Sequence, residues 1–394
     1  MINRRHLRIS VMQGLYSLQM DSNVSLDVAM QLFEEELKDL AFAKNQTNDW
    51  TAAQLAEAET AFELLRQVPV EERRATFFPD DTRPLADRAL VQAASAARQD
   101  KALRRKQLVS NLDAAYVYYL RLLLLVPELA EQVRREEGER QARFIKPEPA
   151  TEAEMRLANN AYADRIAQSA GLKQIALRRG LSWEDNEEFI RRLYKDGLKA
   201  NPYYQDYLAN EQHTEADDLR LVRWLLRVFL INAPIVQDFF EEENYAYGEL
   251  KAATLHLMQE TIKAWQASDS QGELPVQQQG EDWEETTNFL TNLYDKTLEH
   301  RPLVMSRLAE VVQNWDLSRV AVIDLLLIQM SLAEMIEFSS IPVKVSINEY
   351  LEIAKLYSTP QSQAFLNGVL DKMAARLTDE RLIRKTGRGL IDTK

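Results

Sequence analysis

Apolar residues recur every three or four positions along most of this chain, which is the spacing of one buried face of an α-helix. The first helix is predicted to begin after Asn3, a candidate N-cap, and to run to about residue 20. Leu7, Val11 and Leu15 form its apolar stripe. Because such a stripe must be covered, we expect this helix to pack against the helices near the C-terminus or against those of the middle of the chain, despite the long intervening sequence. The same spacing predicts further helices over 26–40, 51–68, 84–107 and 108–126, and throughout the last third of the chain.

Turn-forming residues separate the predicted helices. Asn232-Ala233-Pro234 is expected to end one helix and begin the next, because proline is tolerated only in the first turn of a helix. Thr359 as the N-cap and Pro360 as the first helical residue predict the start of the last helix. Loops are expected at 41–50, 77–81, 145–150 and 277–280.

The composition favours an all-α protein of two packed helical subdomains. The chain is 46% hydrophobic and 28% charged, which is ordinary for a soluble globular protein, and its 394 residues suffice for two or three domains. Only 11 glycines and 12 prolines are present, so helix is favoured almost throughout. Apolar runs are shorter than the roughly eighteen residues that span a bilayer. We therefore expect no membrane association and a cytoplasmic location.

The sequence contains no recognisable pattern of catalytic or metal-binding residues. We therefore predict that the chain is not an enzyme and needs no cofactor. The absence of cysteine excludes disulfides, thiolate metal ligands and cysteine nucleophiles. The four histidines are scattered singly, without the spacing of metal ligands. Asp324 and Asp371 lie in apolar helices and are better interpreted as polar bridges or exposed contacts than as catalytic acids.

The net charge of −13 argues against a protein that coats nucleic acid, but the charge is unevenly distributed. Arg4, Arg5 and Arg8 lie in a stretch of twenty residues without a carboxylate, and residues 376–394 are also basic. Arginines at the start of a helix oppose the helix dipole, at a cost of a few tenths of a kcal/mol each, by order of magnitude. They are either solvated charges or, together with the free amide groups of the first turn, a site for phosphates.

Two stretches near the C-terminus carry more polar residues than helix packing requires. These stretches, 341–349 and 365–372, resemble the NusB family, the small all-helical RNA-binding factors of bacterial transcription antitermination. The matching residues are Pro342, Lys344, Val345, Ile347, Asn348, Glu349, Ala354 and Lys355, then Phe365, Asn367, Gly368, Val369, Leu370, Asp371 and Lys372. The start of the chain also resembles the family's arginine-rich first helix, with Leu7 in place of an alanine; the matching residues there are Arg4, Arg5, Arg8, Gln13, Leu15 and Tyr16.

The resemblance implies that the chain binds a boxA-type single strand of leader RNA. The arginines of the first helix, Arg4, Arg5 and Arg8, would contact phosphates, which favours the second interpretation of their charge. The start of the last helix would provide a neighbouring surface, for which the candidates are Gln361, Ser362 and Phe365. For Phe365, core packing is slightly favoured over stacking on an RNA base, since it lies on an apolar helix.

The resemblance also implies a protein partner, the ribosomal protein NusE, within the transcription elongation complex. Glu334, Glu337 and Lys344 are candidates for a charged rim that contacts NusE, and the two glutamates are otherwise simple solvated charges.

The resemblance predicts a NusB-like fold enlarged by an insertion. The expected parts are residues 1–40, which hold the arginine-rich helix, a helical insertion of unknown role over 41–217, a NusB-like helical domain over 218–380 and a basic flexible tail over 381–394.

Two other functions compete with this interpretation. A helical scaffold that kept the fold and binds other proteins would use the insertion as its working surface. An accessory module related to the N-terminal domain of ribosomal-RNA cytosine methyltransferases is disfavoured, because that enzyme class needs a cofactor domain with a glycine-rich turn and a catalytic cysteine.

Overall fold

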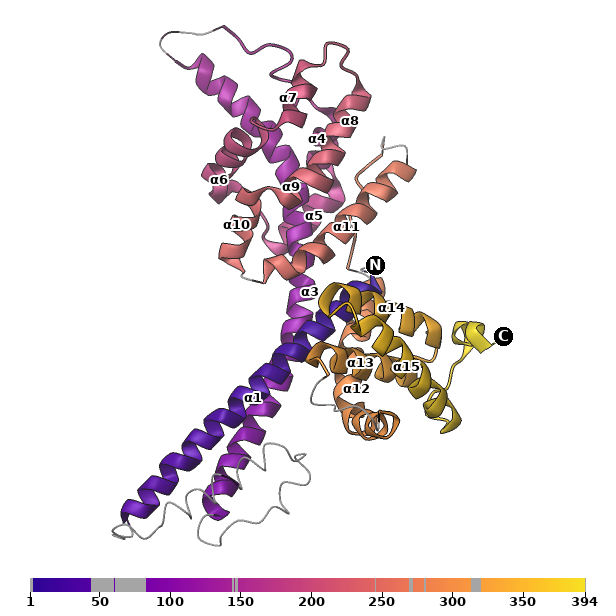
Figure 1. The fold of residues 1–394 in the computed structure, drawn as a ribbon. Coiled ribbons are helices and arrows are strands. Elements are labelled where there is room, and N and C mark those ends of the chain that lie inside the picture. The colour runs from indigo at the N-terminus through magenta and orange to yellow at the C-terminus, as the bar shows by residue number, and fades with distance from the viewer. Residues whose placement is uncertain are drawn as a thin grey trace. The chain divides into compact units, whose positions relative to one another are not determined.

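The computed structural model describes residues 3–43, 60, 83–143, 145, 148–244, 246–268, 272–279, 281–312 and 320–393, and every regular element in these ranges is helical (Figure 1). The α-helices are α1 (Arg4–Ala43), α3 (Arg83–Gln141), α4 (Ala161–Gln168), α5 (Ala170–Arg179), α6 (Glu187–Arg192), α7 (Pro202–Ala209), α8 (Glu215–Trp224), α9 (Leu230–Asn232), α10 (Pro234–Glu243), α11 (Tyr247–Ala267), α12 (Glu281–Val311), α13 (Val322–Glu337), α14 (Val343–Tyr357) and α15 (Ser362–Asp379). Two π-helical segments, η3 (Leu193–Leu198) and η4 (Leu225–Phe229), and two 3-10 helices, η2 (Glu184–Asn186) and η6 (Gly387–Thr393), complete the set. The predicted all-α class is confirmed. The helix expected at 51–68 lies outside the described residues, apart from residue 60.

The chain forms two compact units. Unit 1 consists of Met1–Arg8 and Val109–Leu290, and unit 2 of Ile9–Leu108 and Thr291–Lys394. Each boundary falls within a long helix, so α1, α3 and α12 contribute residues to both units. These units cut the chain at other places than the predicted domains. The division into units does not bear on the predicted insertion, so the range 41–217 stays a prediction.

The core of unit 1 is built around the middle of α3. Tyr119, Leu122 and Val126 on this helix are completely buried. The hydroxyl group of Tyr119 lies 2.6 Å from that of Thr261 on α11, and it accepts a hydrogen bond from the backbone N–H of Gln277 at 3.0 Å. Burial raises the pKa of Tyr119, so its hydroxyl stays neutral. The sequence predicted no apolar segment of membrane-spanning length, but one window of α3 has that length and composition, and 56% of it is buried within the protein.

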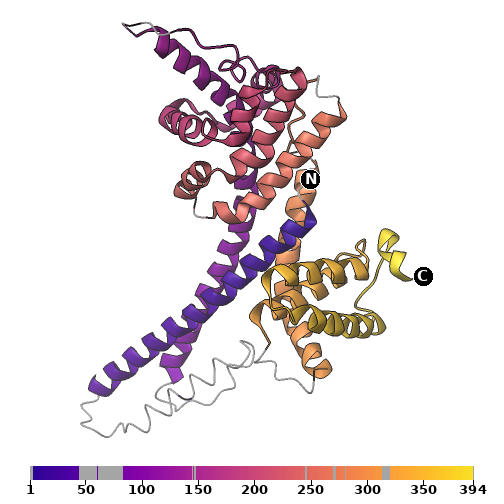
Figure 2. The ribbon, with the colours of Figure 1, turned by 45° about the horizontal axis from the view of Figure 1, so that its top comes forward.

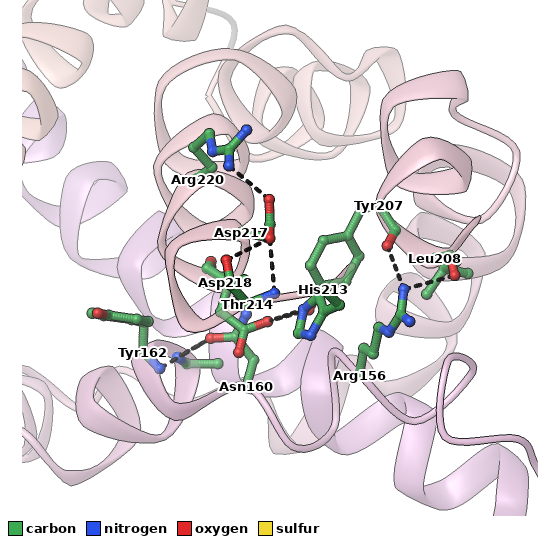
Figure 3. A network of polar contacts seen from close by, with 11 residues as sticks. Arg156, Asn160, Tyr162, Tyr207, Leu208, His213, Thr214, Asp217, Asp218 and Arg220 are labelled. Carbon is green, nitrogen blue, oxygen red and sulfur yellow. Dashed lines mark hydrogen bonds and ion pairs between the residues drawn. The ribbon is translucent and has the colours of Figure 1, made fainter. Parts of the chain in front are cut away.

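A buried polar network joins α4, α7 and α8 in unit 1 (Figure 3). Asn160 caps α4 by accepting the backbone N–H groups of Tyr162 and Ala163 at 3.0 and 3.1 Å. Its side-chain amide donates to the carbonyl of Asp218 on α8 at 3.3 Å. The Asp218 carboxylate accepts the hydroxyl of Tyr207 at 2.6 Å and lies 2.8 Å from Nε2 of His213. Burial and this bond raise the pKa of Tyr207, so its proton stays on the hydroxyl group and the network holds the three helices.

In unit 2, α1 and α3 lie side by side in opposite directions (Figures 1 and 2). Arg104 pairs with Asp21 at 2.8 Å, and Arg88, further back along α3, pairs with Glu36, further along α1, at 2.9 Å. The predicted cover for the stripe of the first helix is confirmed, since Leu7, Val11 and Leu15 are at most 2% exposed.

The two long helices run through positions where the sequence predicted interruptions. The first helix continues from residue 20 to Ala43, because Ala29 and Phe33 on this stretch are buried against the rest of the unit. Asp21 is paired with Arg104 at 2.8 Å, and the Ser22 hydroxyl donates to the Leu18 carbonyl at 2.8 Å within the helix. The segments predicted as separate helices at 84–107 and 108–126 are one helix, which also passes through Pro127. Asn232-Ala233-Pro234 does separate α9 from α10, as expected.

The C-terminal part of unit 2 packs α13, α14 and α15 against one another. Met330, Tyr350 and Met373, one from each helix, are completely buried. The last helix begins at Ser362 and not at Pro360, because the hydroxyl groups of Ser358 and Thr359 bond to Ser362 in a turn that precedes the helix.

The basic segment after α15, predicted to be a flexible tail, folds back onto the turn between α13 and α14. Lys385 Nζ donates to the Phe338 carbonyl at 3.0 Å, and the backbone N–H of Thr386 donates to the Ser339 carbonyl at 3.0 Å. Ile383 is buried. Gly389 touches the same turn so closely that a Cβ atom would lie 2.1 Å from the Ser339 carbonyl oxygen. Only glycine therefore fits at this position.

Asp218→Ala is expected to lower the free energy of unfolding by about 2 kcal/mol, because it leaves the buried Tyr207 hydroxyl without its acceptor. Urea unfolding followed by circular dichroism measures the change. Asp206→Ala, which removes an exposed carboxylate nearby in sequence, is the matched control and should leave the unfolding midpoint unchanged. Equal midpoints for both variants would show that the network adds no stability.

Gly389→Ala is expected to release the C-terminal segment, because the added methyl group cannot coexist with the Ser339 carbonyl. Trypsin should then cleave after Lys385 and Arg388 several-fold faster than in the parent protein, as judged by mass spectrometry of timed digests. Gly138→Ala is the control, since no heavy atom lies within 4 Å of its added methyl group. Unchanged cleavage at residues 385 and 388 would contradict the assigned packing of Gly389 on Ser339.

Candidate nucleic-acid interface

The first turn of α1 is held by Asn3, as the sequence predicted. Asn3 Oδ1 accepts the backbone N–H of Arg5 at 2.9 Å, and the Asn3 carbonyl accepts that of His6 at 3.0 Å. This cap satisfies amide groups that a helix otherwise leaves open at its start. It also fixes the directions in which the first side chains of the helix project.

Two of the three arginines converge on one aromatic ring in unit 1. The guanidinium carbons of Arg4 and Arg8 lie 5.2 and 5.5 Å from the centre of the Phe289 ring, which belongs to α12. Arg4 also forms an ion pair with Glu285, one turn earlier on α12, at 2.7 Å. Cation–π contacts of this kind contribute about 0.5–2 kcal/mol, depending on how far water is excluded. The start of α1 is thus attached to α12 through its own cations.

The three arginines differ in their access to solvent. Arg8 is only 2% exposed, so its side chain supports the helix and does not present a charge to a ligand. The side chain of Arg4 is 40% exposed, and a phosphate there would compete with Glu285 for the guanidinium group. Arg5 is partly exposed. Of the predicted phosphate contacts, Arg4 and Arg5 have access to solvent, whereas Arg8 would need to leave its place beside Phe289.

A histidine pair lies next to these arginines. The ring of His6 is 5.9 Å from that of His256 on α11, and His6 Nδ1 is buried without a hydrogen-bond partner. Burial lowers the pKa of His6, and the positive charges of His256 and Arg5 lower it further. His6 is therefore neutral near pH 7, and the positive charge at this end of the helix comes from the arginines.

The second set of predicted RNA contacts lies at the start of α15 in unit 2. Gln361 is exposed and Phe365 is partly exposed. Ser362 is 3% exposed, and its hydroxyl donates to Asp324 Oδ2 on α13 at 2.6 Å. The other carboxylate oxygen of Asp324 accepts the Ser358 hydroxyl at 2.6 Å. Ser362 therefore joins two helices and does not face a ligand, and Asp324 is the polar bridge that the sequence suggested.

Comparison with known proteins shows which family this chain is similar to. The sequence model of the NusB family matches residues 250–375, which extend from α11 to α15. A transcription antitermination protein NusB from Geobacter sulfurreducens is 38% identical over 93 residues, which are 24% of this chain and 67% of that protein.

The chain belongs to the NusB family.

Two other relatives agree with this membership. The transcription antitermination protein NusB of Salinibacter ruber is 41% identical over 106 residues, which are 27% of this chain and 66% of that protein. The protein of the same name from Chloroherpeton thalassium is 37% identical over 105 residues, which are 27% of this chain and 50% of that protein. The chain thus spans one half to about two thirds of the length of these relatives. No solved structure matches it significantly.

Of the three residues predicted to contact NusE, one is buried and two reach the surface. Glu334 is completely buried, and its carboxylate accepts the Ser346 hydroxyl at 2.7 Å and the Tyr350 hydroxyl at 3.1 Å. It therefore joins α13 to α14 and cannot form part of a partner's rim. Glu337 is partly exposed and lies 2.6 Å from His300 Nε2, while Lys344 is exposed in the first turn of α14.

Sequence reasoning missed the partners of the arginines, Glu285 and Phe289. Both lie on an amphipathic helix in which apolar residues recur at ordinary spacing, so nothing in the sequence distinguishes Phe289 from a core residue. Only the packing of α12 against the start of α1 selects it.

The lowered pKa of His6 predicts a specific loss of stability in acid. The unfolded chain begins to take up a proton near its ordinary pKa of 6.5, before the folded chain does, so the folded state loses stability as the pH falls below that value. The loss is complete once the pH passes the lower, folded pKa. In His6→Gln, the fall in melting temperature between about pH 8 and about pH 5 should be smaller than in the parent protein. Parallel melting curves for the two proteins would contradict this assignment.

Proposed function

We propose that this chain is an RNA-binding transcription antitermination factor that binds boxA-type leader RNA together with the ribosomal protein NusE. The observation that carries the proposal is the family match over residues 250–375, together with relatives that bear the name transcription antitermination protein. The basic start of α1, anchored on Phe289, supports it.

Arg4 and Arg5 supply the charge for the RNA backbone in this proposal. Phosphate contacts of Lys and Arg provide most of the affinity of such complexes and weaken with salt, because binding releases condensed counterions. Single-stranded RNA is the fitting ligand, since its bases are open to recognition and its backbone can follow one helix end. Arg8 would position Arg4 by keeping Phe289 and the first turn in place.

The NusE contact is proposed for the surface at the end of α13 and the start of α14, with Glu337 and Lys344 as members. A chain with net charge −13 suits a basic ribosomal partner. The assembly would act with the transcription elongation complex in the cytoplasm, away from membranes and without catalysis or a cofactor. Residues 41–217 are assigned no part in it.

Replacing Arg4 and Arg5 by alanine should weaken the binding of a dye-labelled boxA RNA by about tenfold or more. The slope of log K against log salt should also become shallower by about 0.7 for each phosphate that an arginine no longer neutralises. Fluorescence anisotropy over a salt series measures both quantities. The control is the double variant Lys173→Ala, Arg178→Ala, which removes two exposed cations from α5. An unchanged slope in the Arg4, Arg5 variant would reject the site.

Co-purification with NusE from the same organism tests the partner separately. A one-to-one complex that Lys344→Glu weakens is the expected result. A folded protein that does not associate with NusE at micromolar concentration would favour a helical scaffold for other proteins.

A further inference from the structure

Three aromatic rings in unit 1 form a stack that opens to solvent. The ring centres of Tyr203 on α7 and Trp224 at the end of α8 are 4.4 Å apart, and the rings are inclined by 20°. Trp224 lies in turn 5.3 Å from Phe229 at 25°. Phe229 is buried and Trp224 is partly exposed, whereas Tyr203 is 39% exposed. One face of the Tyr203 ring rests on Trp224, and the residue as a whole keeps 39% of its surface exposed.

Local backbone geometry builds this stack. Asn201 caps α7 by accepting the backbone N–H of Tyr203 at 2.9 Å, and Pro202 fills the first helical position, so Tyr203 is fixed in the first turn. Trp224 and Phe229 are five residues apart, a spacing that an α-helix places on different sides. The helix is wound as a π-helix over Leu225–Phe229, with the N–H of Leu230 donating to the Leu225 carbonyl. Such π-helical turns occur mostly as short insertions and often at functional sites.

Positive charge accompanies the stack. Arg223 and Arg227 flank Trp224 on the same helical segment, and Arg227 is exposed. Burial lowers the pKa of Arg223, and the charge of Arg227 lowers it further, so the two cations are close. Arg220, one turn earlier, pairs with Asp217 at 2.7 Å. No ion pair or hydrogen bond of Arg227 occurs within the described part of the chain, so its charge is not compensated in the way that Arg220 is.

We propose that Tyr203, Trp224 and Arg227 form a second site for single-stranded RNA. A base stacks on the outer face of Tyr203 and extends the row of rings, while the guanidinium group of Arg227 pairs with a neighbouring phosphate. Open aromatic faces next to cations bind single strands because every base has a π-face and every nucleotide a phosphate. The site lies outside residues 250–375, and it does not depend on Arg4 or Arg5.

The proposal is tested on the full-length protein with a dye-labelled single-stranded RNA and with the same sequence as a duplex. Tyr203→Ala should weaken binding to the single strand by about tenfold, the scale of removing one base–ring stack. Tyr203→Phe keeps the ring and should bind as the parent protein does. Arg227→Gln should bind more weakly, with a salt slope reduced by about 0.7, whereas Arg178→Gln, an equal charge change on α5, should have no effect. Duplex RNA should bind more weakly than the single strand.

Photocrosslinking of thiouridine-containing RNA to the parent protein identifies the contacted residues without changing the site itself. Peptides that carry Tyr203 or Trp224 should bear the RNA adduct, and they should do so in the Arg4→Ala, Arg5→Ala variant as well, which separates this site from the one at the start of α1. Single-strand affinity unchanged in Tyr203→Ala, with adducts confined to other peptides, would overturn the proposal. Loss of a protein partner with unchanged RNA affinity in Tyr203→Ala would overturn it too, and would make the surface a protein contact.

Discussion

Burial of the apolar middle of α3 is the constraint on which unit 1 depends. Tyr119, Leu122, Leu123, Leu125 and Val126 are completely buried. Full burial of an apolar side chain of this size contributes roughly 1.5–3 kcal/mol to stability. A helix with so wide an apolar face must be covered by other helices, and only a narrow strip that includes Arg121 reaches solvent. The polar groups of this core are satisfied individually, as in the contact of the Tyr119 hydroxyl with Thr261. Residues that sequence periodicity assigned to separate helices therefore form one helix, whose first part belongs to unit 2 and whose middle forms the core of unit 1.

Unit 2 uses buried carboxylates for a different purpose. Asp324 and Glu334 lie on the same helix, α13, and each accepts two hydroxyl groups from the segments packed against it. A buried carboxylate is costly unless it is hydrogen-bonded, so each one strongly favours the arrangement that brings its hydroxyl partners into place. Asp324 sets the turn before α15, and Glu334 sets the start of α14. Glu334 and Ser362, which the sequence suggested as contacts for a partner and for RNA, thus help to determine the fold.

At the start of α1, one arginine stabilises the helix while its neighbours can face a ligand. Arg8 is buried beside Phe289, whereas Arg4 and Arg5 keep access to solvent. A similar division occurs at the stack near α8, where Phe229 is buried, Trp224 connects it to the surface and Tyr203 is exposed. In both places an aromatic ring fixes the exposed group. Phe289 holds the guanidinium group of Arg4, and Trp224 holds the ring of Tyr203, which reduces the entropy cost of binding a ligand.

The sequence by itself determined the helical class, the cap at Asn3, the break at 232–234 and the likeness to the NusB family, because these depend on residue type and local spacing. It also indicated that Leu7, Val11 and Leu15 would be covered. Tertiary structure alone decided the length of α1, which continues because Ala29 and Phe33 are buried by segments distant in sequence. It also decided that Glu334, Ser362 and Arg8 are buried. Periodicity shows which face of a helix is apolar, but the position of a polar side chain depends on whether a distant segment supplies its partner. That information lies in the packing of the helices and not in the neighbouring residues.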